Sequence, residues 1–413
     1  MAAKLGRNIG YLSLSQIANY IFPLLTIPYV TRVVGPENYG LVEFATTVLL
    51  YFIVVVDYSF HTTATRKIAA ITNAPEKVNY TFSAVMWSKL LLFSAALLVF
   101  TILMLLIPQF RDNAVILWMA FPIILGWALY PNFLFFGLQK VGVIAFTNVL
   151  IKGAAAALIF IFIKDEGDYY YVPFLNGITQ LVVAGATLWY AFKKIETLKW
   201  LSLKWRSVKV VLQEGKHIFL SHFFTRIYGF GSILIGGFLL TPLELGLFAA
   251  ASKLINVAQS FLLQPLHGAL FPHLSKQKNA GLNIYLKAHT KSLLLLAVLC
   301  LGATLFTILL APWLIKIIFG TDYSASTPLL RIMAPMLLTS GLAHMFLQQG
   351  LLILRKDKVY MYIIIFTGIS SILLNLWLIS VYSITGAAIV RLSTEVLIAL
   401  CAGVFFYRKL KQE

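Results

Sequence analysis

Long uninterrupted runs of apolar residues dominate this chain, and polar residues gather in the short segments between them. Residues 292–315 and residues 113–139 contain no charged side chain. A helix rises about 1.5 Å per residue, so about 20 apolar residues cross the hydrocarbon core of a bilayer. This rule predicts an all-α polytopic membrane protein with about twelve transmembrane helices, at residues 9–33, 40–60, 80–107, 114–137, 141–163, 171–192, 217–240, 245–269, 292–318, 325–353, 359–381 and 384–407.

Two local patterns refine this prediction. Residues 383–386 read Ser-Ile-Thr-Gly inside the longest apolar run, and they predict a tight turn between the last two spans. Lys4 and Arg7 precede the first span as they would in a signal peptide. No small-residue cleavage site follows them, so we expect a retained first helix.

Basic residues are concentrated in every second connection between the predicted spans. Twenty-three Lys and Arg lie in the tails and connections on one side of the membrane, and 4 lie on the other side. Cytoplasmic loops carry the excess of Lys and Arg in membrane proteins. The sequence therefore predicts a multi-pass protein whose N- and C-termini are both cytoplasmic.

The longest break in the apolar pattern covers residues 193–216. Leu198, Leu201, Trp205, Val208 and Leu212 recur there at spacings of three and four, with Lys and Arg between them. This period predicts an amphipathic linker helix in the cytoplasmic headgroup layer, and a plain linker is an equally good interpretation. The chain then divides into six-helix bundles at residues 1–192 and 217–413.

The two predicted halves share sequence patterns at equivalent spans. Pro, Gly and Leu in residues 36–41 recur with the same spacing in residues 242–247, between the first two spans of each half. Residues 119–122 in the fourth span resemble residues 332–335 in the tenth, and each segment ends in Pro. Six spans preserve orientation, so these patterns predict a parallel repeat, which is typical of transporters.

Composition excludes several classes of protein. Hydrophobic residues make up 60% of the chain and charged residues 12%. A soluble globule cannot bury so much apolar surface, and disordered chains are poor in apolar residues. The net charge of +18 follows the predicted topology, so we expect no nucleic-acid partner. Cys300 and Cys401 lie in apolar runs, which predicts free thiols without a disulfide.

Nine charged side chains fall inside the predicted spans, where a charge costs at least about 2.5 kcal/mol and needs a cavity or a partner. They are Lys89, Lys152, Arg226, Lys253, Arg331, Arg391, Glu43, Asp57 and Glu395. Glu43 and Arg391 are close to the outer interface, where water reaches them, and Lys89 is placed to snorkel toward the cytoplasm. Arg391 and Glu395 are four residues apart and are spaced to pair on one helix.

Lys152, Arg226, Lys253 and Arg331 lie deeper, and too few acids accompany them to neutralise them. We therefore predict a cationic cavity that these residues line. Such a cavity suits an anionic substrate, because guanidinium groups bind phosphate and carboxylate groups in bidentate fashion. A cationic substrate would be repelled, which disfavours a typical exporter of cationic drugs.

The sequence contains no metal-ligand spacing, glycine-rich phosphate loop or nucleophile elbow. We predict no catalytic residue, no metal and no cofactor, and hence a protein that is not an enzyme. A membrane glycan polymerase or ligase is a weaker alternative, because the outer connections are too short to assemble an active site. A structural scaffold is disfavoured by the cost of six buried cations.

Residues 23–40 read PLLTIPYVTRVVGPENYG. This segment resembles the first-span signature of Wzx-type O-antigen flippases, in the polysaccharide-transporter branch of the MOP exporter superfamily. Residues 224–254 resemble the start of that family's second half. The resemblance implies a V-shaped pair of six-helix bundles in a bacterial inner membrane. It also implies translocation of undecaprenyl-pyrophosphate-linked oligosaccharide from the cytoplasmic to the periplasmic leaflet by alternating access.

The resemblance implies lipid-linked oligosaccharide, membrane lipids and polysaccharide polymerase machinery as partners. Together with the charge argument it gives the candidate substrate-binding residues Arg32, Lys152, Arg226, Lys253 and Arg331, with Lys89 and Arg391 as secondary candidates. Arg32 lies in the matched first-span motif, and Arg226 and Lys253 lie in the matched second-half segment.

MATE drug exporters of the same superfamily use an acid in the first span of a half to couple transport to cations. The first and seventh spans here contain no acid. The candidate ion-coupling residues are therefore Glu43, Asp57 and Glu395. An ion-coupled small-molecule exporter of the MATE type is the alternative function.

Overall fold

The computed structural model describes the backbone of residues 2–410, and helices account for nearly all of it. The side chains of residues 1–9, 12–14, 17, 20, 267 and 409–413 lie outside the described set, and among them are Lys4 and Arg7, which precede the predicted first span. No strand occurs between residues 2 and 410. Ten helices in this part of the chain are long and apolar enough to cross a membrane, which confirms the all-α polytopic class.

Two of these ten candidates have the length of two crossings each. One covers Ile21–Ala70 and the other covers Asp357–Arg408, which are 50 and 52 residues long. Each contains a residue with non-helical backbone angles near its middle or between its two arms, Gly35 (φ 73°, ψ 169°) in the first and Ser383 (φ 51°, ψ −134°) in the second. Counting each as two spans gives the predicted twelve.

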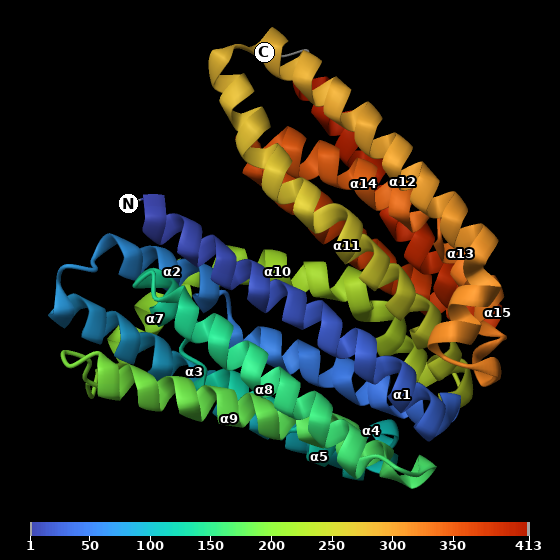
Figure 1. Ribbon diagram of the computed structural model, residues 1–413, viewed down its shortest axis with the longest axis horizontal. Coiled ribbons are helices and arrows are strands. Elements are labelled where there is room, and N and C mark those ends of the chain that lie inside the picture. Colours follow the sequence, from blue (N-terminus) through green and yellow to red (C-terminus); the bar gives the residue numbers. More distant parts are fainter. Residues whose placement is uncertain (1, 411–413) are drawn as a thin grey trace. The chain divides into compact units, whose positions relative to one another are not determined.

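The chain forms two compact units, one up to Phe223 and one from Phe224. Figure 1 shows the helices in sequence colours. The first unit contains α1 (Ala2–Asp57), α2 (Phe60–Ala70), α3 (Pro75–Leu106), α4 (Pro108–Asp112), α5 (Ala114–Ala120), α6 (Pro122–Leu129), α7 (Asn132–Gly137), α8 (Val141–Phe162), the 3-10 helix η1 (Glu166–Tyr170), α9 (Tyr171–Lys194) and the first part of α10 (Trp205–Leu239).

The second unit begins inside α10. It further contains α11 (Pro242–Ala280), α12 (Leu282–Ile318), the 3-10 helix η2 (Thr321–Tyr323), α13 (Ser326–Met333), α14 (Met336–Phe346), the π-helix η3 (Leu347–Leu352) and α15 (Asp357–Leu410). The predicted six-helix bundles at residues 1–192 and 217–413 stay a prediction, because these units are defined by contacts alone.

The turns inside α1 and α15 depend on glycine. Glycine adopts the φ and ψ angles of Gly35 readily, whereas other residues would be strained there. The second arm of α1 starts at Pro36, and the chain doubles back (Figure 1). In α15, a Cβ on Gly386 would overlap the carbonyl oxygen of Leu378. The predicted tight turn at residues 383–386 is confirmed by the non-helical Ser383.

The fourth and tenth predicted spans are broken at the matching prolines. The fourth span divides after Ala120, where α6 starts with Pro122, and the tenth divides after Met333, where α14 follows Pro335. Proline lacks the N–H that an unbroken helix needs. The sequence repeat is therefore also a repeat of local structure.

The ends of these two broken spans are also alike. Gln139 and Arg355 both have φ 56°, a left-handed conformation that is uncommon outside glycine. The next amide in each case closes the same wide turn, from Lys140 N to Phe135 O at 2.9 Å and from Lys356 N to Leu351 O at 2.8 Å. This is the Schellman pattern of helix termination, and these two examples lie at equivalent places in the two units.

The amphipathic helix predicted over residues 193–216 is wrong for residues 195–204. These residues form a non-helical segment, which we call the strap, and α10 begins only at Trp205 and continues unbroken to Leu239. Three side chains of α3 explain the difference, because Asn79, Ser83 and Trp87 supply the hydrogen bonds that a helix would have made internally.

Asn79 and Ser83 each bind the strap twice. Asn79 donates to Thr197 O at 2.6 Å and accepts from Lys199 N at 3.2 Å. Ser83 donates to Lys199 O at 3.3 Å and accepts from Leu201 N at 2.8 Å. Residues four apart share one face of a helix, so α3 presents these groups as a stripe. The strap therefore satisfies its backbone without helical structure.

Candidate functional site

Lys89 is the most completely buried charged side chain of the first unit. It lies on α3 with no exposed surface, and its Nζ is 3.3 Å from Asp57 Oδ1. Nζ also donates to Tyr130 O at 3.0 Å. The expected snorkelling toward the cytoplasm is therefore wrong, because an acid and a carbonyl in the interior satisfy the ammonium group.

Both partners of Lys89 lie where a helix is interrupted. Asp57 ends α1, and the next two residues, Tyr58 and Ser59, have φ values of 51° and 94°. Tyr130 stands between the end of α6 and the start of α7, so its carbonyl lacks a partner one turn later. Lys89 thus connects two helix breaks, which is a structural use of a buried cation.

Lys152 on α8 is half-buried, and its Nζ donates to Asn19 Oδ1 on the first arm of α1. Asn148 lies one helical turn earlier on α8 and interacts with the side chain of Tyr130. The interior of the first unit therefore contains polar contacts from Asp57 through Lys89 and Tyr130 to α8. The sequence pattern predicted Lys152 as a site residue but did not predict its partner Asn19.

Arg32 and Glu43 lie on either side of the turn in α1. Arg32 is exposed, whereas Glu43 is buried and accepts a hydrogen bond from Tyr39 OH at 2.9 Å. The expectation that Glu43 is hydrated is therefore wrong, since only 9% of it is exposed. Its ring partner is four residues earlier on the same helix.

Arg331 in the second unit has a structural contact of its own. Its Nε donates to Ile308 O on α12 at 3.3 Å. Pro312 lies four residues after Ile308 and has no N–H, so this carbonyl has no helical donor. Arg331 therefore compensates for a proline in the neighbouring helix.

Arg391 belongs to a buried polar network. Only 6% of the side chain is exposed, and Nη2 donates to Asn256 Oδ1 on α11 at 2.9 Å. The expectation that Arg391 is hydrated near the outer interface is thus wrong. No ion pair under 4.0 Å joins it to Glu395 in the described chain, where the close pairs are Lys67–Glu214 and Lys89–Asp57.

Glu395 extends this network to α14, because its side chain interacts with Ser340. Gln259 on α11 donates to Ser340 Oγ at 2.5 Å. The network thus joins α11, α14 and α15. Asn256 and Gln259, three residues apart in an apolar helix, are the sequence signal for this network, and the charge pattern does not reveal them because neither is charged.

Arg226 and Lys253 lie on α10 and α11 of the second unit. Arg226 is exposed, and its guanidinium carbon lies 5.8 Å from the ring centre of Phe230, which is one turn later. Lys253 is half-buried and follows the fully buried Ser252.

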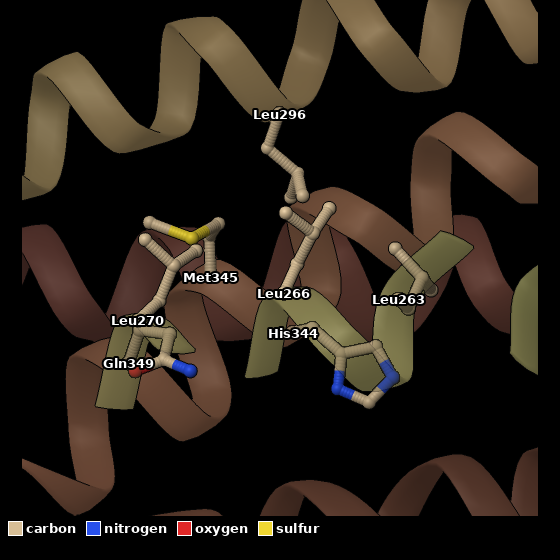
Figure 2. A pocket seen from close by; sticks show the side chains of 7 residues that line it. All are labelled: Leu263, Leu266, Leu270, Leu296, His344, Met345 and Gln349. Carbon is tan, nitrogen blue, oxygen red and sulfur yellow. The ribbon is translucent and has the colours of Figure 1, made fainter. Parts of the chain in front are cut away.

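A small cavity lies deeper in the second unit, between α11, α12, α14 and η3 (Figure 2). Its volume of about 10 Å³ suffices for one water molecule, so it is not a substrate site. Its lining residues are Leu263, Leu266, Leu270, Leu296, His344, Met345 and Gln349. Among the residues that the structure describes, no group of three potential metal ligands occurs.

These features define a polytopic helical membrane protein with two repeated units and charged residues in its interior. The chain belongs to the polysaccharide biosynthesis protein family, whose family model matches residues 5–278. This confirms the relationship to Wzx-type O-antigen flippases that residues 23–40 indicate.

Two curated relatives match almost end to end. A protein of Escherichia coli (strain K12) described as "Putative O-antigen transporter" is 32% identical over 395 residues, which cover 96% of this chain and 95% of the relative. A protein of Shigella dysenteriae with the same description is 28% identical over 400 residues, covering 95% of this chain and 98% of the relative.

Solved structures share the fold at low sequence identity. A multidrug resistance MATE family transporter of the MOP superfamily, in its inward-facing conformation, has a TM-score of 0.78 at 15% identity, with 98% of each chain covered. The lipid II flippase MurJ has a TM-score of 0.71 at 14% identity, covering 97% of this chain and 87% of MurJ. The fold is therefore that of the MOP superfamily.

Proposed function

We propose that this protein is a flippase that moves undecaprenyl-pyrophosphate-linked oligosaccharide, an O-antigen repeat unit or a related glycan, across the bacterial inner membrane by alternating access. The observation that carries the proposal is the end-to-end match to curated proteins described as O-antigen transporters. The direction is from the cytoplasmic to the periplasmic leaflet, with both termini cytoplasmic, and the polysaccharide polymerase machinery receives the product.

The distribution of cations supports an anionic lipid carrier. Lys89 and Arg331 bind carbonyls that lack a helical donor, and Arg391 belongs to a buried network. Arg32, Arg226 and Lys253 are the leading candidates for the pyrophosphate or an acidic sugar, because they lie in the segments that resemble the flippase family, and Lys152, which donates to Asn19 Oδ1, is a further candidate. Charge-assisted hydrogen bonds to phosphate are strong, so a few such residues suffice for a diphosphate.

The test is complementation in the protein's own host after deletion of its gene. The wild-type chain restores surface polysaccharide, and Arg226→Gln and Lys253→Gln reduce it at least about ten-fold at equal protein level, as expected for loss of a charge-assisted contact. Lys316→Gln is the matched control, because Lys316 is an exposed cation at the end of α12.

Two results would contradict these proposals. Wild-type polysaccharide in both variants overturns the roles of Arg226 and Lys253. Normal polysaccharide after gene deletion, together with energised dye efflux by the purified chain in vesicles, overturns the flippase in favour of a MATE-type exporter.

A further inference from the structure

The strap, residues 195–204, lies against an aromatic cluster of the first unit. The ring of Trp200 lies 5.9 Å from Phe82 and 5.9 Å from Trp87, both on α3. Trp200 also stacks on Phe192 of α9, with 6.4 Å between ring centres and 10° between ring planes. The strap is therefore held between the cytoplasmic ends of α3 and α9.

The exposed residues of α3 change from polar to apolar at the level of the strap. On the N-terminal side its exposed residues include Glu76, Lys77 and Tyr80, whereas from Leu91 onward they are almost all apolar. Trp87, which donates to Leu201 O at 3.0 Å, marks the boundary with 41% of its surface exposed. Tryptophan is enriched at this membrane–water boundary, so the strap lies at the depth of lipid headgroups.

Cations outnumber acids along the strap and its two ends, where Glu196 is the one acid among residues 193–209. Lys199, Lys204 and Arg206 are exposed, and the close ion pairs of the described chain involve other residues. Trp205 lies between two of them in sequence and is 62% exposed. At the end of α9, Lys193 Nζ lies 4.6 Å from the ring centre of Trp189, which is 61% exposed.

We propose that the strap and the adjoining ends of α9 and α10 form a binding site for the phosphate headgroup of an anionic phospholipid in the cytoplasmic leaflet. Lys199, Lys204 and Arg206 bind the phosphate, while Trp205 and Trp189 lie beside the glycerol and the upper acyl chains. The site requires that the chain spans the membrane with the proposed orientation, but it does not require the proposed transport function.

Charge and depth together favour a lipid over a soluble anion or a protein strand. Binding of a soluble anion would not involve two exposed tryptophan side chains at the edge of an apolar surface. A protein strand would pair with free backbone groups, but Asn79, Ser83 and Trp87 already occupy those of the strap from Thr197 to Leu201. Basic residues near a membrane surface attract anionic lipids by about 1 kcal/mol each, which equals about five-fold in affinity.

The experiment uses the full-length protein in nanodiscs of phosphatidylcholine, titrated with brominated phosphatidylglycerol or brominated phosphatidylcholine while tryptophan fluorescence is recorded. The wild-type chain is quenched at lower concentration by phosphatidylglycerol than by phosphatidylcholine, and Trp205→Phe reduces this difference between the two lipids. A triple variant, Lys199→Gln, Lys204→Gln and Arg206→Gln, weakens phosphatidylglycerol binding about 100-fold, as expected for three neutralised cations.

The matched control replaces three exposed cations of the second unit, Lys276→Gln, Lys287→Gln and Lys291→Gln, and keeps wild-type binding. Binding within two-fold of wild type in the strap variant overturns the proposal. Equal quenching by the two lipids also overturns it, as does competition by millimolar glycerol phosphate, which would assign the site to a free phosphate. If the triple strap variant does not fold, Lys199→Arg and Lys204→Arg are used in its place. These substitutions retain the charge and must retain binding.

Discussion

The ammonium group of Lys89 lies 3.3 Å from the carboxylate of Asp57, and nothing of the Lys89 side chain is exposed. Asp57→Asn leaves this buried charge without its counter-charge, and we expect a loss of about 3 kcal/mol in the free energy of unfolding. The measurement is the unfolding equilibrium of the purified protein in mixed detergent micelles.

The first unit offers a matched control for this pair. Lys67 and Glu214 lie 3.0 Å apart, but their side chains are 39% and 46% exposed. Glu214→Gln is expected to cost less than about 1 kcal/mol, because water screens an exposed pair. Equal losses for the two substitutions would contradict the role given to Lys89.

Arg331 and Pro312 are expected to be thermodynamically coupled. Arg331→Gln leaves Ile308 O without a donor and is expected to cost about 1–3 kcal/mol. In a Pro312→Ala background the restored helical N–H supplies that donor, so the same substitution costs less. A double-mutant cycle measures the difference. Pro272→Ala on α11 is the control background, and there the two effects are expected to add.

The hydrogen bonds of the strap give a residue-specific prediction. Asn79→Ala removes the acceptor of Lys199 N, and Ser83→Ala removes the acceptor of Leu201 N. Hydrogen exchange is expected to accelerate at Lys199 in the first variant and at Leu201 in the second. Acceleration across the whole first unit in either variant would show that these contacts hold the unit together and not the strap alone.

Gly386 is expected to tolerate no side chain. Gly386→Ala places a methyl group on the carbonyl oxygen of Leu378 and forces the two arms of α15 apart, so we expect little folded protein. Gly302→Ala on α12 is the control, because open space surrounds that position; there the change is expected to stabilise the helix by up to about 1 kcal/mol. Folded yield by size-exclusion chromatography distinguishes them, and equal yields would refute the tight turn.

The spans and the turn at residues 383–386 were predictable because membrane thickness converts apolar length directly into a crossing. The strap was not predictable in the same way. Leu198 and Leu201 follow a helical period, but Asn79 and Ser83, more than a hundred residues earlier, provide stronger hydrogen-bond partners for that segment. A pattern within one segment cannot report a partner on another helix.

The cations show the same limit. Their depth indicated that each needed a partner, and this held for Lys89, Arg331 and Arg391. Which partner each one has depends on where another helix leaves a carbonyl without a donor, at Tyr130 or one turn before Pro312, and on how the helices pack. Sequence position alone therefore could not separate the structural cations from the remaining candidates.

The strap also has a consequence for the order in which the chain is made. The side chains of Asn79 and Ser83 enter the membrane with α3, but their partners, Thr197 to Leu201, leave the ribosome only after α9 has been synthesised. Until then the polar stripe of α3 lacks the partners that it has in the folded protein. The first half of the protein is thus complete only when translation has passed its sixth span, and a chain stopped at residue 194 would be a target for membrane proteases.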